Sequence, residues 1–114
     1  MEPHLVSVII PTYNRAKIAV NTIQSVLNQT YSNLEVIVVS DGIDEDTRWA
    51  VQGIKDARIK YFEIEHSGRP AVPRNSGIRR SCGAFIAFCD DDDIWMPSKL
   101  ELQMKKMLQN NDIG

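Results

Sequence analysis

The chain of 114 residues is 43% hydrophobic and 25% charged, proportions that suit one globular domain. Its net charge of -2 excludes a general basic surface for nucleic acid or anionic lipid, so no nucleic-acid partner is expected. The apolar runs are too short to cross a bilayer and no signal-peptide pattern follows Met1, so we expect a cytoplasmic protein with reduced Cys82 and Cys89.

An apolar, β-branched run at residues 5–10 is the first predicted element. Such a run is typical of a buried strand, and Pro11 is expected to end it. Asn14 is the expected N-cap of the next element. Apolar side chains recur at helical spacing as far as Gln29, so we expect the strand to lead into a helix.

A second apolar run, at residues 34–39, predicts another buried strand. It ends in Ser40-Asp41-Gly42, residue types that favour a turn. Asp44 or Asp46 is expected to cap the short helix that follows, because a carboxylate there accepts hydrogen bonds from unpaired backbone N–H groups. We assign Trp49 of this helix to the core.

Residues 58–64 alternate only partly between apolar and polar side chains, so we expect a strand at the edge of the sheet. The loop after it contains His66, which we interpret as a solvated residue. Pro73 is expected near the start of a helix over residues 74–81. Residues 83–89 then predict a fourth strand.

Four aspartates at residues 90–93 follow the fourth strand directly. Beside an apolar strand and Trp95, water screens their mutual repulsion poorly, so a bound cation is the expected partner and a solvated turn is the alternative. Ser98 and Glu101 form a capping box that predicts the start of the last helix. We assign Trp95 to the core, together with one face of this helix: Leu100, Met104, Met107 and Leu108.

Strands that alternate with helices predict an α/β fold, a doubly wound and mostly parallel sheet with helices on both faces. In such sheets ligands bind outside the carboxyl ends of the strands. Polar side chains follow every predicted strand: Thr12, Tyr13, Asn14 and Arg15, then Asp41, then His66, Ser67 and Arg69, then the four aspartates. The sequence therefore predicts one ligand site with carboxylates, an aromatic ring and an arginine.

Three stretches together resemble the family 2 glycosyltransferases: VSVIIPTYNR (6–15), QTYSNLEVIVVSDG (29–42) and RNSGIRRSCGAFIAFCDDDDIWMPSKLE (74–101). The resemblance runs from about residue 5 to residue 109. It implies the nucleotide-sugar-binding half of the GT-A fold. It also implies an inverting enzyme that takes a sugar from a nucleotide-diphosphate sugar, with a UDP-sugar as the expected donor. Cell-envelope polysaccharide biosynthesis is the expected setting.

The resemblance also implies roles for individual residues. Tyr13 matches an aromatic that stacks on the nucleobase, Asp41 an acid that hydrogen-bonds the base, and Arg69 an arginine that some relatives use for the diphosphate. Asp92 matches the main metal ligand, with Asp90 beside it and close to the ribose. The nucleotide-binding set implied is Pro11, Thr12, Tyr13, Arg15, Asp41, Arg69, Asp90 and Asp91, and the metal set is Asp92 and Asp90.

The implied cofactor is Mn²⁺ or Mg²⁺, a hard cation that takes one or two carboxylates together with phosphate oxygens. Such a cation neutralises charge on the departing nucleoside diphosphate. The sequence Ser40-Asp41-Gly42-Ile43 departs from the two acids and Gly-Ser usual in the family, so one acid and one serine are absent.

Family members continue beyond the acids with an acceptor-binding half that supplies the catalytic base, and no residue here matches that base. We therefore expect residues 1–114 to be a single nucleotide-sugar-binding domain, the N-terminal part of a longer glycosyltransferase. The expected partners are the sugar donor and a saccharide or lipid-linked acceptor, which would make the protein membrane-peripheral. A second copy or the missing half is expected at the open sheet edge.

Two other functions remain open at this point. A nucleotidyltransferase also combines a doubly wound sheet with acids and Mg²⁺, but its first loop is usually rich in glycine, and residues 11–15 contain none. A non-catalytic nucleotide-binding or interaction module is compatible with the length of the chain. A turnover assay separates this module from an enzyme.

Overall fold

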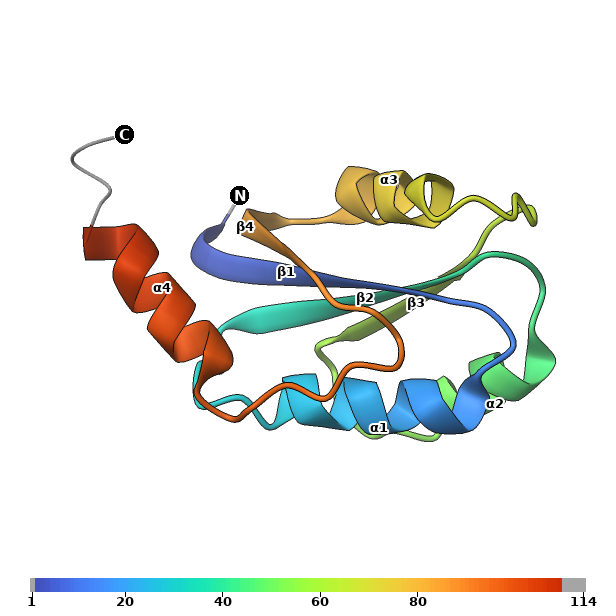
Figure 1. The fold of residues 1–114 in the computed structure, drawn as a ribbon, viewed down its shortest axis with the longest axis horizontal. Coiled ribbons are helices and arrows are strands. Elements are labelled where there is room, and N and C mark those ends of the chain that lie inside the picture. The colour runs from blue at the N-terminus through green and yellow to red at the C-terminus, as the bar shows by residue number, and fades with distance from the viewer. Residues whose placement is uncertain (1, 110–114) are drawn as a thin grey trace.

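The computed structural model describes residues 2–109, which form one four-stranded sheet flanked by helices (Figure 1). The strand order is β3-β2-β1-β4, and every neighbouring pair is parallel. The predicted α/β fold, a parallel sheet with helices on both faces, is therefore confirmed. The elements in chain order are β1 Glu2–Thr12, α1 Ala16–Leu27, β2 Leu34–Ser40, α2 Glu45–Gln52, β3 Ile59–Glu63, α3 Ala71–Arg80, β4 Gly83–Phe88 and α4 Lys99–Gln109.

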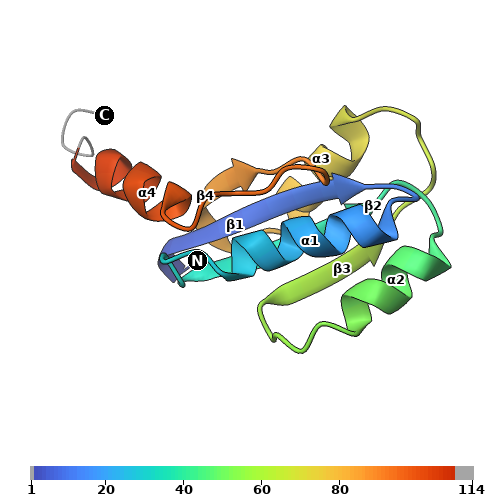
Figure 2. The same cartoon turned by 60° about the horizontal axis from the view of Figure 1, so that its bottom comes forward.

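The main core lies between the sheet and the helices α1 and α2, which Figure 2 shows along the same face. Alternate residues of a strand point to the same face, so Val6, Val8 and Ile10 all enter this core. Ile23 and Val26 of α1 meet them there and are fully buried. Burial of each such side chain stabilises the fold by about 1.5–3 kcal/mol, which explains why these segments form strands and an amphipathic helix.

The opposite face of the sheet carries a smaller core beneath α3. Ile9, Ile37 and Val39 are fully buried there. Gly77 allows α3 to lie directly on β1, because a Cβ at this position would come within 2.5 Å of Cγ2 of Ile9. This close approach brings the first turn of α3 near the carboxyl end of β1 (Figure 1).

A buried carboxylate fixes the amino end of β4 on this second face. Glu35 accepts hydrogen bonds from Ser7 Oγ at 2.6 Å and from the backbone N–H of Cys82 at 2.6 Å, and it pairs with Lys60 Nζ at 2.7 Å. Burial raises the pKa of Glu35, but these donors outweigh burial and the pKa lies below its ordinary value. The carboxylate therefore links β2, β1, β3 and the start of β4.

Several sequence predictions about the first half of the chain are wrong in detail. The first strand continues through Pro11 to Thr12, because Pro11 pairs with Val39 in the parallel ladder. Asn14 does not cap α1; its φ is 60° and its N–H donates to Asp44 Oδ2 at 2.6 Å. Trp49 is 83% exposed, because it lies on the face of α2 that points away from the sheet.

The later part of the chain is also partly as predicted. Asp44 caps α2 as expected, accepting from the N–H of Thr47, and β3 lies at one edge of the sheet. The third helix begins at Ala71 rather than at residue 74, and Pro73 lies in its first turn.

The start of α4 differs from the predicted capping box. In the described part of the chain Ser98 and Glu101 do not exchange hydrogen bonds; instead the N–H of Leu100 donates to Gln29 Oε1 at 3.0 Å, and Thr30 Oγ1 donates to Glu101. Trp95, Leu100 and Met104 are buried as predicted, but Met107 is 54% exposed. Figures 1 and 2 show the reason: α4 runs beyond the amino end of the sheet, away from the carboxyl ends of the strands. Within residues 2–109, the helices are all too short or too polar to cross a membrane.

Candidate functional site

A hollow of about 300 Å³ lies at the carboxyl ends of the strands, where the sequence predicted a ligand site. We call it the edge hollow. It is lined by Pro11, Thr12, Tyr13, Arg15, Asp41, His66, Gly68, Arg69, Pro70, Pro73 and Asp91. All predicted nucleotide-binding residues except Asp90 therefore line one hollow. They come from the ends of β1 and β2, from the loop after β3, and from the turn after β4.

An aromatic wall forms one side of the edge hollow. The ring of Tyr13 packs against Gly42, where a Cβ would lie 2.8 Å from Tyr13 Cε1. Gly42 also has a φ of +141°, which only glycine adopts without strain. The ring of His66 lies 4.6 Å from that of Tyr13, centroid to centroid. Tyr13 remains 44% exposed, so a supported aromatic face is accessible for stacking.

Asp41 forms the floor beside this wall. Its Oδ1 accepts from the N–H of Ser67 at 2.9 Å and from Ser67 Oγ at 2.8 Å, and its Oδ2 accepts from the N–H of Gly68 at 2.9 Å. The side chain is 11% exposed. Burial raises the pKa of Asp41, but these hydrogen bonds outweigh burial and hold the pKa below its ordinary value. Asp41 is therefore ionised at neutral pH and keeps little accessible surface.

The aspartates at residues 90–93, called the acid turn below, include one inward carboxylate, that of Asp91. Asp91 accepts from Thr12 Oγ1 at 2.8 Å and from Arg15 Nη1 at 3.2 Å, and its backbone carbonyl accepts from Thr22 Oγ1 at 2.7 Å. Only 13% of the Asp91 side chain is exposed. Asp91 thus ties the acid turn to β1 and α1, and it holds the turn at a fixed place on the sheet edge.

Asp90 and Asp92 point outward from the same turn, with 69% and 60% of their side chains exposed. Asp90 lies 3.5 Å from Arg74 Nη2, and Asp92 lies 3.5 Å from Arg15 Nη1. The N–H of Asp93 donates to the carbonyl of Asp90 at 3.1 Å, which closes the turn. The backbone of the turn is thus held in place by hydrogen bonds, and its two exposed carboxylates each lie beside an arginine.

These two carboxylates fit a hard divalent cation by the chemistry of their donors. Mg²⁺ and Mn²⁺ prefer oxygen ligands, and Mg²⁺ is usually held by one or two carboxylates plus phosphate oxygens and waters. Across residues 2–109 no three acidic, histidine or cysteine side chains form a cluster able to hold a metal by themselves. A cation at Asp92 and Asp90 would therefore need further oxygen ligands from a bound phosphate group.

Sequence reasoning missed one residue and one contact of this region. Arg74, which was assigned no role, lies beside Asp90, and the ring of His66, exposed as expected, also forms part of the aromatic wall. Neither has a local signal, because each reaches the site through packing of the β3–α3 region against β1 and β2. A polar stretch directly after an edge strand was the one available hint for His66.

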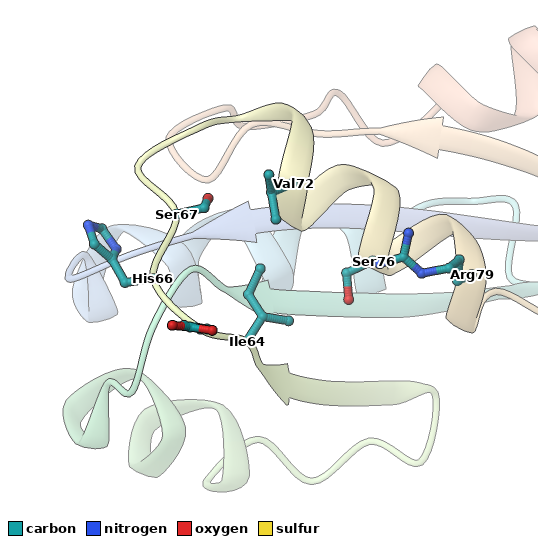
Figure 3. Close-up of a pocket in the computed structure, with 7 residues that line it drawn as sticks. Ile64, His66, Ser67, Val72, Ser76 and Arg79 are labelled. Atoms are coloured by element: carbon teal, nitrogen blue, oxygen red, sulfur yellow. The ribbon is translucent and has the colours of Figure 1, made fainter.

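A second hollow, of about 350 Å³, lies on the other side of residues 64–69, between them and α3 (Figure 3). We call residues 64–69 the His66 loop and this cavity the helix hollow. The helix hollow is lined by Ile64, Glu65, His66, Ser67, Val72, Ser76 and Arg79. His66 lines both hollows, so the His66 loop is a thin wall between them.

Comparison with protein families places these observations in context. The model for glycosyl transferase family 2 matches residues 7–114. An uncharacterized glycosyltransferase of Rickettsia bellii (strain RML369-C) is 51% identical over 109 residues, which are 95% of this chain and 16% of the relative. The Escherichia coli UDP-Glc:alpha-D-GlcNAc-diphosphoundecaprenol beta-1,3-glucosyltransferase WfgD is 43% identical over 111 residues, 97% of this chain and 44% of the relative. The chain thus spans less than half the length of either relative.

Solved structures share the fold. S. aureus TarS 1-349 in complex with UDP superposes with a TM-score of 0.85 and 28% identity, over 93% of this chain and 32% of that chain. The mannosyltransferase PcManGT from Pyrobaculum calidifontis, in complex with GDP-Man and Mn²⁺, has a TM-score of 0.81 and 27% identity, over 90% of this chain and 32% of that chain. The expected GT-A fold is confirmed by these neighbours.

Proposed function

The chain belongs to glycosyl transferase family 2, and we propose from this premise that it binds a nucleotide-diphosphate sugar, with a UDP-sugar as donor, in the edge hollow. The observation that carries the proposal is the edge hollow itself, where an aromatic ring, an ionised carboxylate and two arginines meet from separate segments. Support comes from the relative named for UDP-Glc and from the TarS complex with UDP.

The aromatic wall is proposed to hold the nucleobase. Tyr13 offers a ring that Gly42 supports from behind, and stacking on such a ring suits any base. Asp41 Oδ2 accepts a single protein hydrogen bond within residues 2–109, so it keeps an acceptor position for a base N–H group. Pro11 and Thr12 complete this part of the hollow.

The cationic side of the edge hollow is proposed to bind the diphosphate. Arg15 and Arg69 both line the hollow, and guanidinium groups match phosphate oxygens in geometry and charge. Arg15 pairs with Asp91 and Asp92 at 3.2 and 3.5 Å, so it lies between the edge hollow and the acid turn. A phosphate group here would lie next to both cations and beside the acid turn.

Asp92, with Asp90 beside it and close to the ribose, is proposed to hold Mn²⁺ or Mg²⁺. When bound, the cation would neutralise the charge that develops on the departing nucleoside diphosphate. Asp91 contributes by fixing the acid turn through Thr12 and Arg15, which keeps the two outward carboxylates at the diphosphate end of the hollow. Support for a cation comes from the donor chemistry and from the neighbour with GDP-Man and Mn²⁺.

We further propose that residues 1–114 act as the donor-binding domain of a longer enzyme that transfers the sugar with inversion to an acceptor hydroxyl. The catalytic base and the acceptor site would lie in the remainder of that enzyme, in keeping with the share of each relative that the chain spans. A saccharide or lipid-linked acceptor is proposed by analogy with the undecaprenol-linked acceptor in the name of the E. coli relative. Such an acceptor would bring the enzyme to the cytoplasmic membrane surface.

A thermal-shift panel tests donor binding. The purified protein is heated with UDP, GDP, CDP or ADP, each with and without Mn²⁺. A ligand at about 100 times its Kd adds about 2.7 kcal/mol to the free energy of unfolding, which a melting curve resolves. We expect stabilisation by UDP that requires Mn²⁺. Absence of a shift with all eight combinations would contradict the proposed function.

A further inference from the structure

Residues 66–68 of the His66 loop are tethered to the sheet through a single residue, Asp41. Ser67 N–H, Ser67 Oγ and Gly68 N–H all donate to the carboxylate of Asp41, and His66 Nδ1 donates to the carbonyl of Asp41 at 2.5 Å. Within residues 2–109, every hydrogen bond that joins residues 66–68 to another segment ends on Asp41. Loss of this one side chain would remove the three bonds to the carboxylate at once.

Packing holds the His66 loop at two places, where Ile64 meets the smaller core and where the ring of His66 lies against Tyr13. The helix hollow and the edge hollow both border the loop, and Figure 3 shows His66 and Ser67 on the segment that leads from Ile64 to α3. His66, Gly68 and Arg69 are exposed. Between these two places the loop has a hollow on each side and few packing partners, so the position of Ser67 and Gly68 depends mainly on the bonds to Asp41.

The backbone of the loop is shaped to receive this carboxylate. Gly68 has a φ of +68°, and the successive N–H groups of Ser67 and Gly68 point to the two oxygens of one carboxyl group. Consecutive amides of this kind form a concave anion site. An asparagine at position 41 would keep one acceptor oxygen but would turn an NH₂ group toward one of these N–H donors. It would therefore not substitute for the carboxylate.

We propose that Asp41 is a positioning residue that holds the His66 loop against the sheet edge and thereby sets His66 and Arg69 at the edge hollow. This role goes beyond any contact of Asp41 with a base. The part that concerns Arg69 rests on the proposed function, because it assumes that Arg69 meets the diphosphate of the donor. The part that concerns the loop stands without any ligand.

Amide hydrogen exchange of the protein without nucleotide, followed by NMR, tests the tether. In Asp41→Asn, we expect the amides of Ser67 and Gly68 to exchange about tenfold faster or more, because each loses its charged acceptor. The amide of Ile64, which donates to the carbonyl of Ser40, and the amide of Cys89, which donates to Ile9, should keep their rates if the fold is intact. Unchanged rates at Ser67 and Gly68 would overturn the proposal.

Two further variants support this comparison. Asp46→Asn removes the same charge from an exposed residue close by in the chain, and its loop amides should exchange as in the unmodified protein. Ser67→Ala keeps both backbone donors and removes only the hydroxyl, so its loop should loosen less than that of Asp41→Asn. If Asp41→Asn fails to fold, faster exchange at Gly68 in Ser67→Ala supports the tether and an unchanged rate contradicts it.

A double-mutant cycle tests whether Asp41 acts through Arg69. Asp41→Asn and Arg69→Ala are combined, and the affinities for UDP and for uridine are measured with Mn²⁺ present. We expect each single change to weaken UDP about tenfold, and the double variant to be little worse than Asp41→Asn, because Arg69 is already misplaced there. For uridine, Arg69→Ala should have no effect in either background.

Fully additive losses for UDP would contradict action through Arg69 and would leave Asp41 as a direct ligand contact. If the unmodified protein binds no UDP, the proposed function is contradicted, and the exchange rates of the ligand-free protein still decide whether Asp41 tethers the loop.

Discussion

The turn after β2 and the acid turn after β4 look alike in the sequence and differ in the structure. Each places aspartate directly after an apolar strand, at the same edge of the sheet. Asp41 is 11% exposed and accepts from three donors of the His66 loop. Asp92 is 60% exposed, and in the described chain its carboxylate has one cationic neighbour, Arg15, at 3.5 Å.

Burial and hydrogen-bond donors therefore give different roles to carboxylates that are chemically identical. A buried carboxylate that accepts from several N–H and O–H donors of the protein organises the protein around itself. An exposed carboxylate with one exposed arginine beside it remains available to a ligand. The acid turn contains both kinds, because Asp91 resembles Asp41 in burial while Asp90 and Asp92 point outward. The same sequence motif thus combines a structural acid with two candidate ligands.

Removal of an outward acid should have the largest effect on ligand binding. Asp92→Asn is expected to lower the affinity for UDP with Mn²⁺ by more than ~10–100-fold, the loss typical when a residue behind a metal ligand is removed. The free energy of unfolding, measured with urea, should differ from that of the unmodified protein by less than about 0.5 kcal/mol, because the side chain is exposed. Asp93→Asn, an exposed acid of the same turn, is the control. Equal UDP affinities in the two variants would remove Asp92 from the metal site.

Removal of the inward acid should instead affect stability. Asp91→Ala leaves Thr12 Oγ1 and Arg15 without their acceptor, and we expect the free energy of unfolding to fall by about 1–3 kcal/mol. Asp93→Ala should stay within about 0.5 kcal/mol of the unmodified protein. Urea unfolding measures both. If the two variants were equally stable, Asp91 would not anchor the turn.

The aromatic wall should affect ligand binding without affecting the metal. Tyr13→Ala is expected to weaken UDP by about 1–3 kcal/mol, the range found for loss of an aromatic that stacks on a base. Tyr13→Phe keeps the ring and should bind nearly as the unmodified protein does. Titration calorimetry with UDP and Mn²⁺ compares them. A Kd unaffected by Tyr13→Ala would make Tyr13 a packing residue only.

The smallest expected effect is the contribution of Asp41 to stability at acidic pH. Its pKa is lower in the folded protein than in the unfolded chain, so the ionised form contributes stability above the ordinary pKa of about 3.9. This contribution is lost as the pH falls below that value and through the lowered pKa. His66 Nδ1 lies 3.6 Å from Asp41 Oδ2. Thermal unfolding at a series of acidic pH values should decline less steeply for Asp41→Asn, and identical slopes would contradict the assignment.

The sheet and the place of the edge hollow were predictable because their signals are local. Four apolar runs indicated the strands, and the polar side chains after each run indicated the shared edge that Tyr13, Asp41 and Asp91 now line. The assignment of Trp49 to the core was wrong because helical spacing alone does not tell which face of a short helix meets the sheet. The assignment of Met107 to the core was wrong because the sequence does not show where α4 extends beyond the sheet.

The burial of the individual acids and the donors that each accepts from could not be read from the sequence. The donors to Asp41 lie 26 and 27 residues away in the chain, and Asp91 meets Thr12 and Arg15 across 79 and 76 residues. Such distant partners leave no periodic or motif signal. They depend on the register of β1 against β4 and on the path of the His66 loop.

The most direct test of this division is the dependence of UDP affinity on Mn²⁺ in two matched variants, Asp41→Asn and Asp92→Asn. The Kd for UDP is measured with and without Mn²⁺ by titration calorimetry. The ratio of the two values should be retained in Asp41→Asn, although both affinities fall, and it should approach one in Asp92→Asn. A ratio lost in Asp41→Asn, or retained in Asp92→Asn, would contradict the division of the acids into a tether and a metal ligand.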